Sequence, residues 1–214
     1  MGNHQTPKYA AVILAAGLSS RMGRFKPLLP LGNETVAGRL ITTFLDAGID
    51  IFMVTGHRAD ELRTGLQPFP VTFIDNPDYE HGMLTSVQAG LAALPGEYSG
   101  AFIAPVDVPL VSPETVRRLL RAYTASPGRI VIPAFNGKKG HPPLLPSALF
   151  AEIRSEPRDS NLRNVLHRHA DSTVLVPVTD PNIIFDIDRS GDYAELLARY
   201  EAVAAGREKH GTAE

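Results

Sequence analysis

The sequence predicts an α/β fold with a mostly parallel sheet that is covered by helices on both faces. Short apolar runs alternate with segments whose apolar residues recur at helical spacing, and this alternation extends through most of the 214 residues. Several runs are apolar at consecutive positions, which is typical of strands buried on both faces of a sheet. The sequence shows no internal repeat and no interdomain linker. We therefore expect one domain over residues 9–205, a disordered leader over residues 1–8 and a frayed tail over residues 206–214.

The first half of the chain supplies four of the expected strands. The run over residues 9–15 contains Val-Ile-Leu and predicts a buried strand, which a loop follows over residues 16–26. In the helix expected over residues 34–47, Val36, Leu40 and Phe44 share one side, and Gly48 supplies a C-terminal stop. The other elements expected here are a strand over 51–54, a helix over 59–66, a strand over 71–74, a helix over 83–94 and a strand over 101–104.

The second half continues the alternation. Ser112 followed by Pro113 is typical of a helix start, and this helix extends to Tyr123. The elements expected after it are a strand over 130–132, a short helix capped by Ser160, strands over 173–178 and 183–187, and a last helix from Ser190. Ligands of open parallel sheets bind beyond the carboxyl ends of the strands. We therefore expect the functional residues in the loops over 15–26, 55–58, 75–86, 105–109 and 186–190.

The composition limits the possible partners and compartments. The chain contains no cysteine, which excludes disulfide frameworks, thiolate metal sites and a cysteine nucleophile. This fits a reducing compartment, and we expect a cytoplasmic protein. The formal net charge is −2, which argues against general binding of nucleic acid. No apolar run reaches the ~20 residues that span a membrane, so we expect no membrane partner.

The loop after the first strand carries the strongest signal for function. Ala15, Ala16 and Gly17 have small side chains, so the backbone there can approach a ligand closely. Successive backbone N–H groups in such a turn can bind an anion. Arg21 and Lys26 add two cations nearby. The loop lacks the Gly-Lys-Ser/Thr ending of a P-loop and the glycine spacing of a dinucleotide-binding fold, but its parts together predict a triphosphate site.

Three carboxylates follow expected strands. Asp107 lies between Pro105 and Pro109, just past an apolar run. Asp186 and Asp188 lie two residues apart at the end of an expected strand, so they point to the same face and repel each other unless a cation or a proton compensates. Mg²⁺ takes one or two carboxylates together with substrate phosphates. These residues predict a shared magnesium site, although one of the pair could instead cap the helix that follows.

Two more segments carry candidate binding residues. Asn76 begins the loop after the third expected strand, and the helix that follows carries Thr85 and Ser86 in its first turn. Hydroxyls and backbone N–H groups at a helix start can bind a phosphate or a base edge. Further along, the prolines after Gly140 and His141 hold this histidine in a rigid turn.

These motifs resemble the nucleotidyltransferase family that attaches a nucleotide to the molybdenum cofactor, and most closely its cytidylyltransferase branch. The resemblance extends over residues 9–200 and keeps the family's order of motifs. It is carried by Ala15-Ala16-Gly17-Leu18-Ser19-Ser20-Arg21-Met22-Gly23 with Lys26, Asn76-Pro77-Asp78-Tyr79, Gly82 with Leu84-Thr85-Ser86-Val87, Asp107 before Pro109, Gly140-His141-Pro142 and Asp186-Ile187-Asp188. The first motif is shared with many enzymes that form sugar nucleotides, whereas the combination with the Gly-His-Pro turn is more specific.

The resemblance implies a three-layer Rossmann-like nucleotidyltransferase fold and Mg²⁺ as cofactor. It favours CTP over GTP, because guanylyl-transferring relatives usually carry a glycine at the position of Ala16 and a glycine-rich segment at that of Leu84-Thr85-Ser86. The expected nucleotide-binding residues are Leu14, Ala15, Ala16, Gly17, Ser19, Ser20, Arg21, Lys26, Thr55, Asn76, Thr85 and Ser86. The expected catalytic residues are Arg21, Lys26 and Asp107, the metal ligands are Asp107, Asp188 and Asp186, and the acceptor-binding residues are His141 and Gly140. Pro105-Val106 replaces the small residue that the family often has before the metal-binding aspartate, which makes the acceptor less well defined than the nucleotide.

The reaction that follows is the transfer of CMP from CTP to the terminal phosphate of molybdopterin, with release of pyrophosphate. A molybdenum hydroxylase apo-enzyme is a further expected partner. Two alternatives stay open at this point. The chain could transfer a cytidylyl or uridylyl group to a sugar or polyol phosphate, or it could bind nucleotide and pterin without catalysis as an accessory factor for molybdenum hydroxylases.

Overall fold

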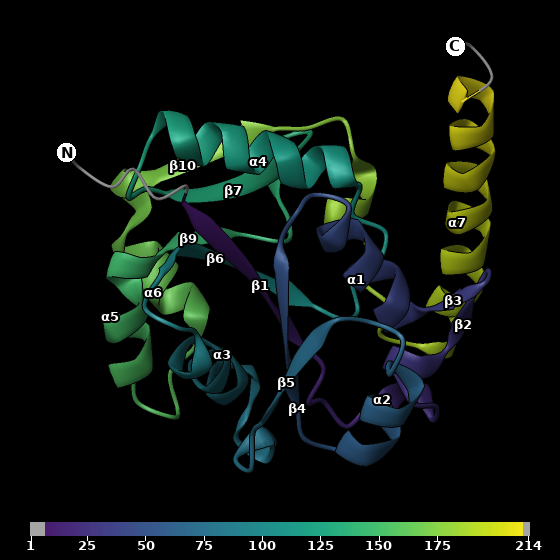
Figure 1. The fold of residues 1–214 in the computed structure, drawn as a ribbon, viewed down its shortest axis with the longest axis horizontal. Coiled ribbons are helices and arrows are strands. Elements are labelled where there is room, and N and C mark those ends of the chain that lie inside the picture. The colour runs from purple at the N-terminus through teal and green to yellow at the C-terminus, as the bar shows by residue number, and fades with distance from the viewer. Residues whose placement is uncertain (1–6, 212–214) are drawn as a thin grey trace.

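The computed structural model describes residues 7–211 and confirms the expected α/β fold of three layers (Figure 1). Its centre is an eight-stranded sheet in the order β10-β7-β9-β6-β1-β4-β5, with β8 paired to β7. The strands are β1 (Lys8–Leu14), β4 (Asp50–Thr55), β5 (Val71–Asp75), β6 (Tyr98–Pro105), β7 (Ile130–Phe135), β8 (Lys138–Lys139), β9 (Leu144–Pro146) and β10 (Thr173–Pro177). A separate two-stranded hairpin consists of β2 (Pro30–Leu31) and β3 (Glu34–Thr35).

The sheet is mostly parallel, as the apolar runs predict. β1 lies at its centre and pairs in parallel with both β4 and β6, so that Val12 lies beside Phe52 on one side and Ile103 on the other. β9 is inserted antiparallel between β6 and β7. Because β9 runs opposite to both neighbours, β6 and β7 keep the same direction, and the carboxyl ends of β1, β4, β5, β6 and β7 share one edge of the sheet.

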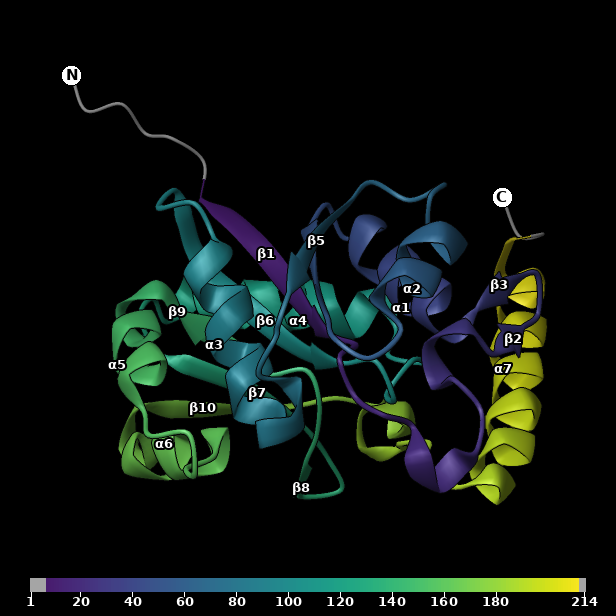
Figure 2. The same ribbon diagram turned by 90° about the horizontal axis from the view of Figure 1, so that it is seen from below.

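Helices cover both faces of the sheet (Figures 1 and 2). α1, α2 and α4 pack on one face, and α3, α5 and α6 pack on the other, which gives two apolar cores separated by the sheet. α7 stands at the side of the molecule beside the β2–β3 hairpin. The helices are α1 (Val36–Leu45), α2 (Ala59–Gly65), α3 (Met83–Ala93), α4 (Pro113–Ala125), α5 (Phe150–Ser155), α6 (Leu162–Arg168) and α7 (Ser190–Gly211). None of the helices within residues 7–211 combines the length and apolar character needed to cross a membrane.

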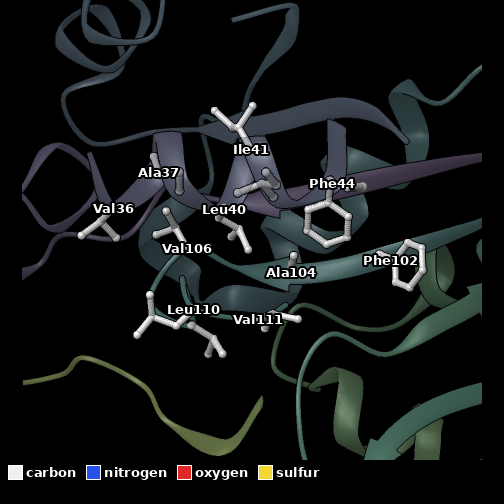
Figure 3. Close-up of a cluster of buried hydrophobic side chains, with 14 of the residues drawn as sticks. Val36, Ala37, Leu40, Ile41, Phe44, Phe102, Ala104, Val106, Leu110 and Val111 are labelled. Atoms are coloured by element: carbon white, nitrogen blue, oxygen red, sulfur yellow. The ribbon is translucent and has the colours of Figure 1, made fainter. Parts of the chain in front are cut away.

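The larger core explains how β6 and the loop after it are fixed in place (Figure 3). Apolar residues of α1 pack against β6 and against the segment that follows it. The labelled side chains of this cluster are Val36, Ala37, Leu40, Ile41, Phe44, Phe102, Ala104, Val106, Leu110 and Val111. Val106 and Val108 are both buried in this core, so the chain on either side of Asp107 is anchored. The carboxylate of Asp107 is therefore presented from a rigid segment.

The strand expected over residues 183–187 is wrong. Residues Pro181–Ile184 form a short 3-10 helix, because the Asp180 side chain accepts a hydrogen bond from the Asn182 N–H and Pro181 fits the first helical turn. The following backbone bonds to loops instead of to a strand: the N–H of Ile187 donates to the carbonyl of Asp107 over 2.9 Å. Asp186 and Asp188 consequently lie in a loop, and the face-sharing rule for strands does not apply to them.

The remaining differences concern the ends of elements, one helix and four short strands. Asn161 caps α6, where Ser160 is expected, because its side chain accepts from the N–H of Asn164. Five elements, α5, β2, β3, β8 and β9, were not expected from the sequence. α7 continues to Gly211, into the segment expected to be a frayed tail, and residues 1–6 of the expected leader lie outside the described part of the chain.

Candidate functional site

The loop after β1 forms a closed hook at the carboxyl edge of the sheet. The N–H of Ala15 donates to the carbonyl of Val54 over 2.9 Å, which keeps the start of the loop on the sheet. Ser19 has a positive φ of 52°, and its hydroxyl accepts a hydrogen bond from the backbone N–H of Lys26 over 3.2 Å. Between these two residues lies the short 3-10 helix Ser20–Met22. The loop therefore returns on itself and brings Lys26 back beside its own beginning.

Asp188 joins the two cations of this loop. Lys26 Nζ donates to Asp188 Oδ1 over 3.0 Å, and Arg21 Nη1 donates to Asp188 Oδ2 over 2.7 Å. The Lys26 side chain is only 11% exposed, whereas the Arg21 side chain is 71% exposed, so Lys26 is the enclosed cation of the pair. The hydrogen bond from Lys26 is the main cause that lowers the pKa of Asp188. Arg21 and Lys26 thus form one charged cluster with Asp188, although they lie 167 and 162 positions from it in the sequence.

Asp107 lies beside this cluster and is poorly solvated. Desolvation raises the pKa of its carboxyl to about 6, and the nearby Lys26 opposes this shift. The charges of Asp186 and Asp188 add to the increase. Asp107 is thus close enough to the other two carboxylates predicted for the metal site to be repelled by their charges.

This donor set fits Mg²⁺ that arrives with a nucleotide. Among the residues that the structure describes, no group of three or more His, Asp or Glu side chains is arranged to hold a metal ion by itself. Mg²⁺ usually keeps several waters and binds one or two carboxylates together with substrate phosphates. Asp107 and Asp188 are two hard oxygen donors near the two cations, and the repulsion at Asp107 is relieved by a divalent cation. Asp186 is exposed and lies close to Asp107, so it stays a candidate third ligand.

A small pocket of about 300 Å³ opens beside the hook. Residues of the loop after β1 form one wall, and residues at the start of α3 form the other. From the expected nucleotide-binding set, its lining contains Leu14, Ala15, Ala16, Gly17, Ser19, Lys26 and Ser86. Arg21 lies at the charged cluster, and the side chain of Ser20 falls outside the part of the chain that the structure describes.

Asn76 connects the loop after β5 to the first turn of α3. Its buried side-chain amide donates to the hydroxyls of Thr85 and Ser86 over 3.0 and 2.9 Å, and its amide oxygen accepts from the N–H of Asp78. The Thr85 hydroxyl also bonds the carbonyls of Asp78 and Gly82. Asn76 and Thr85 therefore shape the wall that presents Ser86 to the small pocket.

The hydroxyl of Thr55 is not part of the small pocket. It bonds the carbonyl of Ile74 over 3.2 Å and the carboxylate of Asp75 over 2.8 Å, and Asp75 is also bound by Arg63. Thr55 is fully buried and lines neither of the two cavities described here. The structure thus does not bring its side chain to the other candidates.

A second, larger cavity of about 960 Å³ adjoins the small pocket. Gly140 and His141 line it together with Asp107 and Asp186. The N–H of His141 donates to the carbonyl of Ile183 over 2.8 Å, and a Cβ at Gly140 would lie 2.5 Å from that same carbonyl oxygen, so only glycine permits this approach. Desolvation by the cavity walls lowers the pKa of His141, and the charge of Asp186 opposes this shift.

The two cavities share one wall. Gly82, Met83, Pro105 and Asp107 line both of them. A ligand in the small pocket and a ligand in the large cavity would therefore meet at Asp107. The arrangement suits a reaction between two bound molecules, because it holds both on either side of one carboxylate.

Most residues that line the large cavity were not expected from the sequence to be functional. One face of α6 forms part of its lining. The residues involved, Arg163, Leu166 and His167, lie three and four positions apart, which is the spacing of a single helix face. Lys139 of β8 also lines it. The helical spacing was a usable signal, but nothing in the sequence alone shows which molecule or element that face meets.

Comparisons with known proteins agree with this geometry. Residues 11–173 match the MobA-like NTP transferase domain. The chain is 32% identical to the molybdenum cofactor cytidylyltransferase of Escherichia coli (strain K12), over 90% of this chain and 97% of that protein. It is 30% identical to the nicotine blue oxidoreductase of Paenarthrobacter nicotinovorans, over 92% of this chain and all of that protein. A solved nucleotidyl transferase from Methanothermobacter thermautotroptrophicus superposes with a TM-score of 0.78 at 26% identity and covers 94% of this chain and all of that one.

Proposed function

The chain belongs to the MobA-like NTP transferase domain family and is a nucleotidyltransferase, and we propose that it transfers CMP from CTP to the terminal phosphate of molybdopterin in the molybdenum cofactor. One observation carries the proposal: two adjoining cavities of unequal size share the wall that bears Asp107. The small pocket next to the cations receives CTP, and the large cavity receives the acceptor. The similarity to the Escherichia coli cytidylyltransferase, which extends over nearly the whole of both chains, supports this choice of substrates.

In the proposed reaction, an oxygen of the acceptor phosphate attacks the α-phosphorus of CTP in line. The bond from that phosphorus to the β-phosphate oxygen breaks, and pyrophosphate leaves with the electron pair. A phosphate monoester is already anionic near neutral pH, so the reaction needs no strong general base. The chain's contribution is to position the two substrates and to neutralise charge.

Each residue of the charged cluster has a part in this proposal. Lys26 and Arg21 bind the triphosphate of CTP, and the small side chains of Ala15, Ala16 and Gly17 let the backbone approach the nucleotide. Asp107 and Asp188 would hold Mg²⁺, which supplies charge neutralisation at the phosphates when it is bound. His141 and Gly140 contact the acceptor from the other cavity. Ala16 and Ser86 favour a pyrimidine, since they occupy the positions where guanylyl-transferring relatives usually have glycine.

The test is release of pyrophosphate with Mg²⁺ and each of CTP, GTP, ATP and UTP, with and without intact molybdenum cofactor. We expect release only with CTP plus cofactor. Asp107→Asn should lower this rate on the order of 10²–10³-fold, the range measured when one group that stabilises transition-state charge is removed. Asp159→Asn is the matched control, because Asp159 is an exposed aspartate that lines neither cavity, and it should keep the rate.

Other outcomes separate the alternatives. Release with CTP or UTP and a sugar or polyol phosphate, but not with the cofactor, would favour a sugar-nucleotide synthesis. Binding of CTP and cofactor without release would favour the accessory factor for molybdenum hydroxylases. Full Mg²⁺-dependent turnover by Asp107→Asn would contradict the role of Asp107 whichever acceptor is used.

A further inference from the structure

The large cavity has cations that the reaction proposed above does not use. Arg163 on α6 and Lys139 on β8 both line it. Within residues 7–211, neither has a carboxylate at ion-pair distance. The arginines on either side of Arg163 in the sequence are paired: Arg158 binds Asp78 through two hydrogen bonds of 2.9 and 3.0 Å, and Arg168 binds Glu152. Arg163 is thus an unpaired cation that faces a cavity.

The spacing along α6 explains why the exposed side chain of Arg163 lines the cavity. Arg163, Leu166 and His167 lie three and four residues apart, so they share one face of the helix, and all three line the cavity. Val165, on another face, is fully buried in the core beneath α6. The packing of Val165 therefore fixes the rotation of α6 that turns Arg163 toward the cavity.

The carboxylates and the cations that line the cavity come from different elements. Asp107, on the wall shared with the nucleotide pocket, interacts electrostatically with Asp186, which also lines the cavity. Arg163 and Lys139 come from elements that line only the large cavity. Figure 2 shows α6 on the side of the molecule away from the loop after β1. Apolar side chains such as Ile103, Ile132 and Leu166 line the same cavity.

This placement of charges determines the chemistry of a suitable acceptor. An acceptor with a single anionic group would be attracted to Arg163 and Lys139, and its phosphate would then lie away from the nucleotide. An acceptor with an apolar middle and a second anionic group satisfies both ends, because the second group binds the cations and the phosphate is left beside Asp107. Hydrogen bonds between an anion and a guanidinium in partly apolar surroundings are among the strong ones.

We propose that Arg163, assisted by Lys139, binds a second anionic group of the acceptor, at the end opposite to the phosphate that is cytidylylated. This inference rests on the proposed function for the identity of the acceptor. The cation site itself depends only on the cavity. Arg163 is therefore a specificity-determining residue, and its removal affects acceptor binding without affecting CTP binding.

A pair of fluorescent dyes tests the cation site without turnover. Anilinonaphthalene sulfonate has an apolar aromatic body and one anionic group, and N-phenylnaphthylamine has the same body without the anion. We expect both dyes to bind the wild-type chain. Arg163→Gln and Lys139→Gln should each weaken binding of the sulfonate dye about 10-fold, which corresponds to one charge-assisted hydrogen bond, and should leave the neutral dye unchanged. Arg154→Gln is the matched control, an exposed arginine outside both cavities, and should change neither dye.

Any other pattern in the dyes overturns the inference. Equal loss of both dyes would mean that the substitutions disturb the apolar wall, and unchanged binding of the sulfonate would mean that Arg163 and Lys139 bind no anion. Kinetics with CTP and molybdenum cofactor form the second arm. There Arg163→Gln should raise the KM for the cofactor about 10-fold and leave the KM for CTP and kcat unchanged. If the dyes behave as expected but no pyrophosphate is released with any nucleotide, the proposed function fails and the anion site stands.

Discussion

Replacing Gly90 by alanine should destabilise the wild-type chain and stabilise a chain that carries Val12→Ala. Gly90 lies in the middle of α3 and is buried against β1. A Cβ added there would meet Val12 Cγ1 at less than 3.0 Å, a separation that real Cβ atoms essentially never show, but it would lie 3.5 Å from Val12 Cβ, which is an ordinary contact. The obstacle to alanine is therefore the methyl group of Val12 and not the backbone of β1.

The expected magnitudes follow from this geometry. Overpacking a core by one methyl group costs roughly 1–3 kcal/mol, and replacing glycine by alanine inside a helix contributes about 1 kcal/mol in the opposite direction. Gly90→Ala should therefore lower the free energy of unfolding of the wild type by up to about 2 kcal/mol. In the Val12→Ala background the clash is gone, apart from Val54 Cγ2 at 3.0 Å, and the same change should raise it by about 1 kcal/mol.

The assay is urea unfolding of the four chains of this double-mutant cycle, followed by circular dichroism. The coupling energy between the two positions should be roughly 1–3 kcal/mol, with opposite signs for Gly90→Ala in the two backgrounds. Val12→Ala alone should be destabilising, because it leaves a cavity beneath α3. Additive effects, or a stabilising Gly90→Ala in the wild type, would refute the argument that close approach of α3 to β1 requires glycine here.

Three further predictions concern the ends of β4 and β5 and the loop that follows β5. Thr55→Val should leave the KM for CTP unchanged and reduce the free energy of unfolding by about 1 kcal/mol, because the Thr55 hydroxyl bonds only Ile74 and Asp75. A several-fold rise in the KM for CTP would instead show that Thr55 contributes to nucleotide binding. Asn76→Ala should lower the free energy of unfolding by roughly 1–3 kcal/mol in denaturant titrations and raise the KM for CTP, because two hydrogen bonds to the first turn of α3 and one from the Asp78 N–H are lost. The hydrogen bond from Thr55 lowers the pKa of Asp75, so its carboxylate contributes stability above the ordinary aspartate pKa and loses it as the pH falls through the lowered value. The stability difference between wild type and Asp75→Asn should accordingly shrink as the pH falls below about 4, and a difference independent of pH between 7 and 3 would exclude this linkage.

The order of elements could be predicted because each of the main strands is apolar enough to be recognised alone. The run that forms β1 and the helical spacing that forms α1 are local signals, and the structure confirms both. β9 could not be predicted in this way, since it has only three residues, ends in a proline and becomes a strand by pairing with β6 and β7. Residues 183–187 show the opposite error, because their apolar spacing imitates a strand while Asp180 and Pro181 start a 3-10 helix.

The candidate site could likewise be predicted only in part. Loop position was enough to bring Arg21, Lys26 and Asp107 together, because the carboxyl ends of parallel strands share one edge of the sheet. The direction of individual side chains was not predictable. Thr55 ends β4 at the expected edge of the sheet, yet its hydroxyl bonds Asp75. This direction depends on the neighbouring strand β5 and cannot be read from the local sequence.

Asp188 illustrates why residue type alone does not define a metal site. Both of its oxygens are bound by cations, so in this structure it serves as the counter-ion that keeps Lys26 and Arg21 beside the small pocket. Without that carboxylate, the enclosed ammonium of Lys26 would face only the desolvated Asp107. In the reaction proposed above, a triphosphate offers the two cations stronger anionic partners than one carboxylate does, and its binding would free the oxygens of Asp188. On that proposal the arrangement links two requirements of nucleotidyl transfer: the cations are held in place before the nucleotide binds, and a carboxylate would become available for Mg²⁺ once it has bound.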